Sequence, residues 1–162
     1  MRLYTGQLVF EFIVCTAATV FFSLLMRAPR KTIPLTALVG GASWVVFELL
    51  LANNQPEISA YFFGTMVVAV SAEVMARIFK MPAPIFIFPS LIPVVPGTRL
   101  YKTALALVEE RYVEFRDEAT RTLFAFCAIA VALALTNVAA RSLSAYLSTR
   151  ARRKLQKRQG KS

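Results

Sequence analysis

Four long apolar runs alternate with polar stretches along the chain, and each run predicts a membrane-spanning helix. The runs are Gly6 to Met26, Pro34 to Leu51, Ile58 to Ile78 and Thr122 to Tyr146. Each is close to the about 20 residues that a helix needs to cross the hydrocarbon core of a bilayer. The hydrophobic pattern therefore predicts an all-α membrane protein.

A fifth apolar stretch, Ala83 to Val95, is shorter and rich in proline. Five of the eight prolines lie between residues 82 and 101. Proline lacks a backbone donor and clashes with the preceding helical turn, so a continuous helix is not expected here. As a helix the stretch would cover about 20 Å of a core about 30 Å thick. We therefore expect the next helix, Thr98 to Val108, to complete the crossing.

The Pro96-Gly97 pair marks the centre of this break, because glycine can take positive φ. We expect Thr98 to be the N-cap of the helix that follows. Broken backbone at bilayer depth is tolerated only where it is buried in protein or lines an aqueous cavity. The break therefore predicts a functional site.

The residues around the break resemble a family motif. IPVVPGTRLYKTALALVEE, from Ile92 to Glu110, is similar to the IP-x-x-PG motif and following helix of the threonine/serine exporter family. Arg27 to Leu50 resembles the family's first cytoplasmic loop and second helix, and Phe62 to Phe86 its third helix and the approach to the break. The resemblance is to the C-terminal, roughly five-helix half, which also occurs as a small separate protein. It implies a polytopic helical bundle of about five spans, with a fourth helix broken at Pro-Gly.

The composition agrees with a membrane protein. Hydrophobic residues make up 57% of the chain and charged residues 17%, and the mean hydropathy is +0.57. The apolar share is above that of an average soluble domain. We expect one transmembrane exporter domain over residues 1–148 and a basic cytoplasmic tail over residues 149–162.

The distribution of charge predicts the topology. Basic residues gather at 27–31, at 77–80 and in the tail, where residues 150–161 hold seven Lys or Arg and no acid. The turn at 53–57 has no positive charge, and the connector at 109–121 is rich in acids. Because basic loops stay in the cytoplasm, five crossings place the N-terminus outside and the C-terminus inside. We expect a multi-pass protein of the plasma (inner) membrane.

Several residue types that carry enzyme chemistry are missing. The chain has no histidine, and its two cysteines, Cys15 and Cys127, lack the spacing of metal ligands. No phosphate-loop glycine pattern is present. We therefore expect neither an enzyme nor a cofactor or metal. The tail has no aromatic residue on which bases could stack, so we interpret its charge as attraction to membrane lipid rather than nucleic-acid binding.

Three acidic residues, Glu11, Glu48 and Glu73, lie inside predicted spans. An ionisable group there is costly and normally faces a cavity or a partner, so each is a candidate for proton coupling during transport. The alternative is a structural role. Glu73 precedes Arg77 by four residues, which predicts an ion pair on one helix face. Glu11 and Glu48 lie near the outer ends of their spans, where an interfacial position also explains them.

Polar residues follow the break directly. An unwound Pro-Gly corner leaves free N–H groups and a partial positive charge at the next helix N-terminus, which favours a carboxylate. Discontinuous helices carry substrate sites in many transporters. The alternative is an interfacial hairpin whose cations extend to lipid headgroups. The predicted substrate site consists of Pro96, Gly97, Thr98, Arg99, Tyr101 and Lys102.

The resemblance implies a subunit of a secondary, proton-coupled exporter of small amino acids such as threonine and serine, or of related small carboxylates. Because only the C-terminal half is matched, it also implies a hetero-oligomer with a separately encoded partner that carries the N-terminal half. Two other classes stay open. One is a structural or assembly subunit without substrate contact, and the other is a self-sufficient homo-oligomeric channel.

Overall fold

The computed structural model describes the backbone of residues 5–159 and the side chains of residues 6–142. This part of the chain is helical throughout, apart from short turns, which confirms the predicted fold class. The elements are α1 (Thr5–Leu25), α2 (Ile33–Ala52), α3 (Glu57–Phe79), α4 (Pro84–Leu91), the 3-10 helix η1 (Ile92–Val94), α5 (Gly97–Val108) and α6 (Tyr112–Gln159). The basic tail is helical to Gln159, but its side chains lie outside the described residues.

Within the part of the chain that the structure describes, four helices are long and apolar enough to cross a membrane. They are α1, α2, α3 and the first part of α6, and α4 with η1 adds a shorter apolar segment. Large apolar side chains cover much of the outer surface, such as Phe10 and Phe21 of α1, which are 67% and 71% exposed. A soluble monomer rarely exposes so large an apolar surface, whereas lipid accommodates it.

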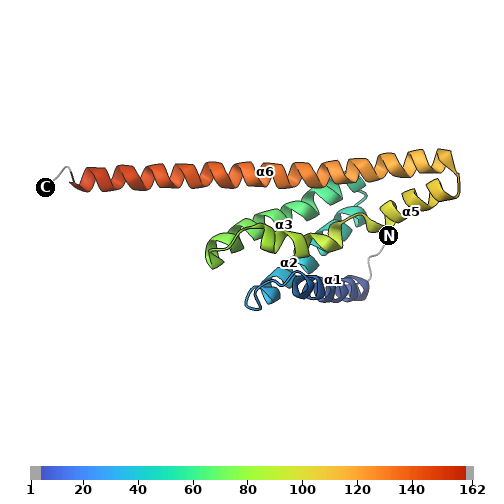
Figure 1. Cartoon of the computed structure of the whole chain (residues 1–162), viewed down its shortest axis with the longest axis horizontal. Coiled ribbons are helices and arrows are strands. Elements are labelled where there is room, and N and C mark those ends of the chain that lie inside the picture. The colour runs from blue at the N-terminus through green and yellow to red at the C-terminus, as the bar shows by residue number, and fades with distance from the viewer. Residues whose placement is uncertain (1–4, 160–162) are drawn as a thin grey trace.

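Each of the four long helices packs against the next long helix, around a small core. Helix α1 packs on α2, α2 on α3 and α3 on α6, while α4 and η1 contact α2 and α3 (Figure 1). The core gathers Phe47, Tyr61, Val94 and Ile129 from four elements. Close approach of α1 to α2 depends on a glycine of α2, because a Cβ on Gly41 would overlap side chains of α1.

The two ends of the bundle differ in charge. The basic α1–α2 loop lies beside the start of α4, where Met26, Pro29 and Pro84 line one small cavity. The α2–α3 turn lies at the opposite end, together with α5 and the acid-rich start of α6 (Figure 1). The alternation of basic and non-basic loops along the chain predicts this separation of the basic loop from the 53–57 turn and the acid-rich segment. Which end faces the cytoplasm stays a prediction.

The short apolar stretch is broken, as predicted, but the details of the break differ from the prediction. Helix α4 continues through Pro89, η1 follows, and Val95 is extended with φ −61° and ψ 132°. Helix α5 then begins at Gly97 with Pro96 as its N-cap, so Thr98 is not the cap. No glycine in the described backbone has positive φ. The chain turns at Val95 and Pro96, and Gly97 is already helical.

Helix α5 extends the chain beyond the end of α3 instead of lying within the bundle beside α4, as a completed crossing would require. Arg99, in the first turn of α5, ion-pairs with Glu57, the first residue of α3. The chain has therefore reached that end of the bundle before α5 begins, because a 3-10 turn and extended residues advance farther per residue than an α-helix. Helix α5 packs on α6, and the pair projects past the bundle (Figure 1). The predicted connector at 109–121 is a short turn followed by the first residues of α6.

Candidate functional site

The backbone break lines a cavity of about 390 Å³ at the end of the bundle, which we call the break cavity. Its apolar wall includes Trp44, Phe47 and Leu51 of α2. Its polar wall includes Glu57 of α3 and Glu118 of α6. The volume falls within the about 300–1,000 Å³ of small-molecule pockets.

Most residues of the predicted substrate site meet in this cavity. Pro96, Gly97, Thr98, Arg99 and Lys102 all line it. Tyr101 is not among the lining residues, and it is 65% exposed on the surface of α5. The broken backbone thus borders a cavity, as the physics of the bilayer requires. Substrate binding there stays a prediction.

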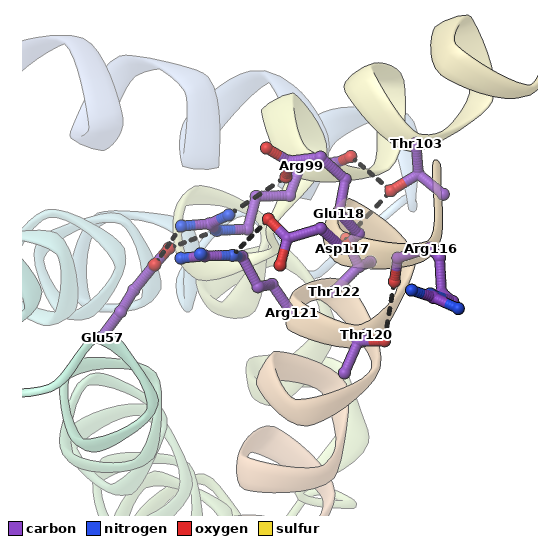
Figure 2. A network of polar contacts seen from close by, with 9 residues as sticks. All are labelled: Glu57, Arg99, Thr103, Arg116, Asp117, Glu118, Thr120, Arg121 and Thr122. Carbon is purple, nitrogen blue, oxygen red and sulfur yellow. Dashed lines mark hydrogen bonds and ion pairs between the residues drawn. The ribbon is translucent and has the colours of Figure 1, made fainter. Parts of the chain in front are cut away.

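Arg99, which lines the break cavity, joins three helices (Figure 2). Its Nε donates to Glu57 Oε1 at 2.5 Å, its Nη2 donates to Glu57 Oε2, and its Nη1 donates to Glu118 Oε2 at 3.1 Å. The Glu57 contact is a bidentate pair, the stronger geometry for arginine and carboxylate. The hydrogen bond to Glu57 is the main cause that raises the pKa of Arg99. Arg99 is therefore a charged residue whose charge is already balanced.

A line of threonines extends this network along the α5–α6 contact (Figure 2). The Thr103 hydroxyl donates to the Arg99 carbonyl at 2.9 Å and lies 3.2 Å from the Thr122 hydroxyl. Thr122 donates to the Glu118 carbonyl at 2.7 Å. Helix α5 therefore turns polar and small side chains toward α6.

A second face of α5 is apolar and exposed. Leu100 and Leu107 are 51% and 49% exposed, and Val108 is 79% exposed. Next to them, at the start of α6, Val113 is 78% exposed. In a soluble helical hairpin the apolar face is buried and the polar face is exposed, whereas α5 exposes apolar side chains. The face suits lipid or another protein rather than water.

Lys102 differs from Arg99 in having no partner among the described residues. It is exposed, it lines the break cavity, and it makes no hydrogen bond or ion pair with any residue that the structure describes. The third cation on the wall, Arg121, is held by Asp117, whose Oδ2 accepts from its Nε at 3.0 Å. Lys102 is therefore the one cation of this wall that no described side chain pairs with, although the second carboxylate on Arg99 offsets its charge at longer range.

Two of the predicted coupling carboxylates, Glu11 and Glu48, lie near the break cavity. Glu11 of α1 accepts hydrogen bonds from Gln7 Nε2 at 3.0 Å and from Trp44 Nε1 at 3.1 Å. Trp44 in turn lines the cavity. Glu48 lies one turn after Trp44, is partly buried, and has no hydrogen-bond or ion-pair partner among the described side chains.

Glu73 lies toward the other end of α3, and its predicted ion pair with Arg77 is wrong. Arg77 Nη2 donates instead to the carbonyl of Ala140 on α6, at 3.0 Å. Glu73 lines a second cavity of about 350 Å³ between α3, α4 and α6, together with Arg141. Sequence reasoning missed Arg141, as well as Glu57 and Glu118, because their contacts or shared cavity walls depend on how distant helices pack.

The described residues contain no group of three or more His, Cys, Asp or Glu side chains placed to hold a metal ion.

A family model described as "Threonine/Serine exporter, ThrE" matches residues 11–139. The chain belongs to the threonine/serine exporter family. The match runs from α1 into the apolar part of α6 and includes the whole break. This confirms the resemblance of the IP-x-x-PG segment, and it makes the chain a multi-pass membrane protein of a transporter family.

An uncharacterized protein of Haemophilus influenzae (strain ATCC 51907 / DSM 11121 / KW20 / Rd) is a relative of this exporter-family chain. The two are 26% identical over 117 residues, which is 72% of this chain. The aligned part is 39% of the relative, so the chain spans about two fifths of the relative's length. No solved structure matches the chain.

Proposed function

We propose that this exporter-family chain is a subunit of a secondary exporter of small amino acids such as threonine and serine, or of related small carboxylates. Its break cavity binds the carboxylate of the substrate. The observation that carries the proposal is the unpaired Lys102 on the wall of a cavity that the broken backbone also lines. A positive charge that no described residue pairs with suits an anionic substrate, which must bind and then be released.

The start of α5 adds to this attraction. Its N-cap is Pro96, which gives the first turn no side-chain cap, so N–H groups of that turn remain available to a ligand. The helix dipole contributes about 0.3 to 2 kcal/mol toward an anion there. Thr98 offers a hydroxyl on the same wall. Arg99 pairs with two carboxylates and so holds the broken backbone in place. Lys102 supplies the positive charge that binds the substrate carboxylate.

A proton gradient drives the export in this proposal. A partly buried carboxylate without a partner can take up a proton at low cost, because the neutral form is the better one in an apolar setting. Glu48 has these properties close to the break cavity, and Glu11 and Glu73 are the other two candidates. Glu48 is therefore the first residue to test for coupling.

The transporter in this proposal is a hetero-oligomer. A separately encoded partner carries the N-terminal half, which agrees with the alignment to only 39% of the relative. The exposed apolar face of α5 offers a surface for that partner. The protein lies in the plasma (inner) membrane with the N-terminus outside and the C-terminus in the cytoplasm. The break cavity then opens outward, since the basic loops gather at the opposite end.

The decisive experiment begins with purification of the chain from its native membrane and identification of the protein that accompanies it. The complex is reconstituted in vesicles with labelled threonine, and flux is measured with and without a pH gradient. We expect Lys102→Gln to raise the threonine concentration at half-maximal flux at least tenfold. Lys80→Gln, which removes a cation at the other end of the bundle, is the matched control. Flux that is unchanged in Lys102→Gln, or that the chain supports without any partner, contradicts the proposal.

A further inference from the structure

The second cavity, between α3, α4 and α6, has the features of a site for a complete amino acid. We propose that it binds a small zwitterionic amino acid on the cytoplasmic side, with Glu73 facing the ammonium group and Arg141 facing the carboxylate. This inference rests on the proposed function, because it adds a second substrate site to the same exporter.

Opposite charges line the cavity from two different helices. Glu73 comes from α3 and Arg141 from α6, and the cavity measures about 350 Å³. Arg141 Nε donates to Asn137 Oδ1 at 3.0 Å, which leaves its terminal nitrogens without a described partner. Among the side chains described, no ion pair joins Glu73 to Arg141. An acid and a base that share a cavity without pairing leave both charges available to a ligand.

The position of Glu73 strengthens this assignment. It is partly buried in a membrane-spanning helix and has no hydrogen-bond or ion-pair partner among the residues described. A carboxylate in such a helix is costly unless it faces a cavity or a cation. The nearest cation in sequence on its helix, Arg77, is engaged with the Ala140 carbonyl of α6. A ligand ammonium group would satisfy Glu73 in a way that the described protein does not.

The other residues that line the second cavity favour a small ligand of the amino acid class. Ile87, Phe88 and Leu133 form apolar walls, and the volume is near the lower end for ligand pockets, which suits a small ligand. The Thr136 hydroxyl is also on the wall and, while donating to the Ala132 carbonyl at 2.9 Å, retains a lone pair for a ligand donor. A dicarboxylate would bring a second negative charge toward Glu73. The cavity therefore favours an amino acid over a dicarboxylate.

Three labelled probes separate the two ends of the ligand: threonine, 3-hydroxybutyrate, which lacks the amine, and 1-amino-2-propanol, which lacks the carboxylate. Binding is measured at one pH, without a gradient, on the purified complex. We expect Glu73→Gln to weaken threonine binding at least tenfold while 3-hydroxybutyrate binding is unchanged. Arg141→Gln should weaken threonine and 3-hydroxybutyrate while 1-amino-2-propanol is unchanged, and Arg141→Lys should restore part of the loss. Glu114→Gln and Arg116→Gln, on the exposed start of α6, are the controls.

The outcomes distinguish this inference from the proposed function. If Lys102→Gln weakens binding but folded Glu73→Gln and Arg141→Gln do not, the second site is refuted and the proposed function stands. Equal losses for threonine and 3-hydroxybutyrate in Glu73→Gln also refute it, because they show a general disturbance of the fold. If the wild-type complex neither binds nor transports threonine, both proposals fail.

Discussion

Arg99 and Glu57 join the start of α5 to the start of α3 through a bidentate ion pair. The pair fixes the break at the end of the bundle, since Glu57 is the first residue of α3. The two side chains are 21% and 33% exposed. The network is thus partly shielded from water, and its loss has a structural cost that an exposed ion pair would not have.

The first prediction separates this structural role from binding. Arg99→Gln removes the cation that pairs with both Glu57 and Glu118, whereas Glu57→Gln leaves Arg99 paired with Glu118. We expect Arg99→Gln to destabilise the α5–α6 hairpin by about 1 to 2 kcal/mol, a value below that of a fully buried pair because water screens these groups. Thermal unfolding and protease cleavage near the α5–α6 turn measure the effect, which should be smaller for Glu57→Gln.

Arg121→Gln is the control for this prediction. Arg121 and Asp117 pair one helical turn apart, with side chains 58% and 61% exposed, so we expect little loss of stability. Identical unfolding of the wild type, Arg99→Gln and Arg121→Gln would show that the Arg99 network does not hold the hairpin.

The second prediction concerns Gly97. The motif suggests that glycine is needed for its backbone conformation, yet Gly97 is helical without positive φ, and a Cβ added there meets nothing within 4 Å. We therefore expect Gly97→Ala to be as stable as the wild type or about 0.4 to 1 kcal/mol more stable. Even Gly97→Val should fold, because the position has room for a larger side chain.

Gly41→Ala provides the contrast. A Cβ there would overlap Thr16 and Phe12 of α1, so this variant should lower the unfolding temperature. If Gly97→Ala folds normally but no longer transports, the glycine serves close approach of the substrate to the backbone. Reduced folding of Gly97→Ala would contradict the geometry described for the start of α5.

The third prediction is the topology. Single cysteines at Asn54 and Glu114, in a background without Cys15 and Cys127, should react with an impermeant reagent added from outside intact cells. A cysteine placed after Arg150 should react only after the membrane is opened. Arg99 joins the start of α3 to the start of α6, so the α2–α3 turn and the start of α6 lie at one end of the bundle, and the first two positions should share a side (Figure 1). Labelling of Glu114 and the tail from the same side would rule out five crossings.

Much of the fold is predictable from local sequence. The first three apolar runs agree with α1, α2 and α3 to within a few residues, because Pro34 and the polar turn at 53–57 mark their limits. The start of α6 was missed because charged residues suggested a connector. Those charges instead pair along the helix, as Arg121 does with Asp117, and so support a helix in water.

The site was predictable only in part. The break and its cations follow from proline, glycine and charge, all of which are local. The sequence assigned one role to Arg99 and Lys102, but the structure separates them, because the partners of Arg99 lie 42 and 19 residues away. The same limit explains Glu73. Residues four apart on a helix can form an ion pair, which predicts a Glu73–Arg77 pair. In the packed structure Arg77 instead donates to a carbonyl of α6, and Glu73 lines a cavity.

The last prediction tests proton coupling through Glu48. Glutamine keeps the shape of the side chain but cannot exchange a proton, so Glu48→Gln should abolish the acceleration of threonine export by a pH gradient. Exchange of labelled for unlabelled threonine at equal pH should continue, because that process needs no net proton movement.

Loss of both activities would point to a folding or binding defect, which a threonine-binding measurement on the same protein detects. Glu114→Gln, which alters an exposed acid 58% open to solvent, should keep both activities. If Glu11→Gln, Glu48→Gln and Glu73→Gln each retain gradient-driven export, coupling does not pass through these three carboxylates, and the proton site belongs to the partner.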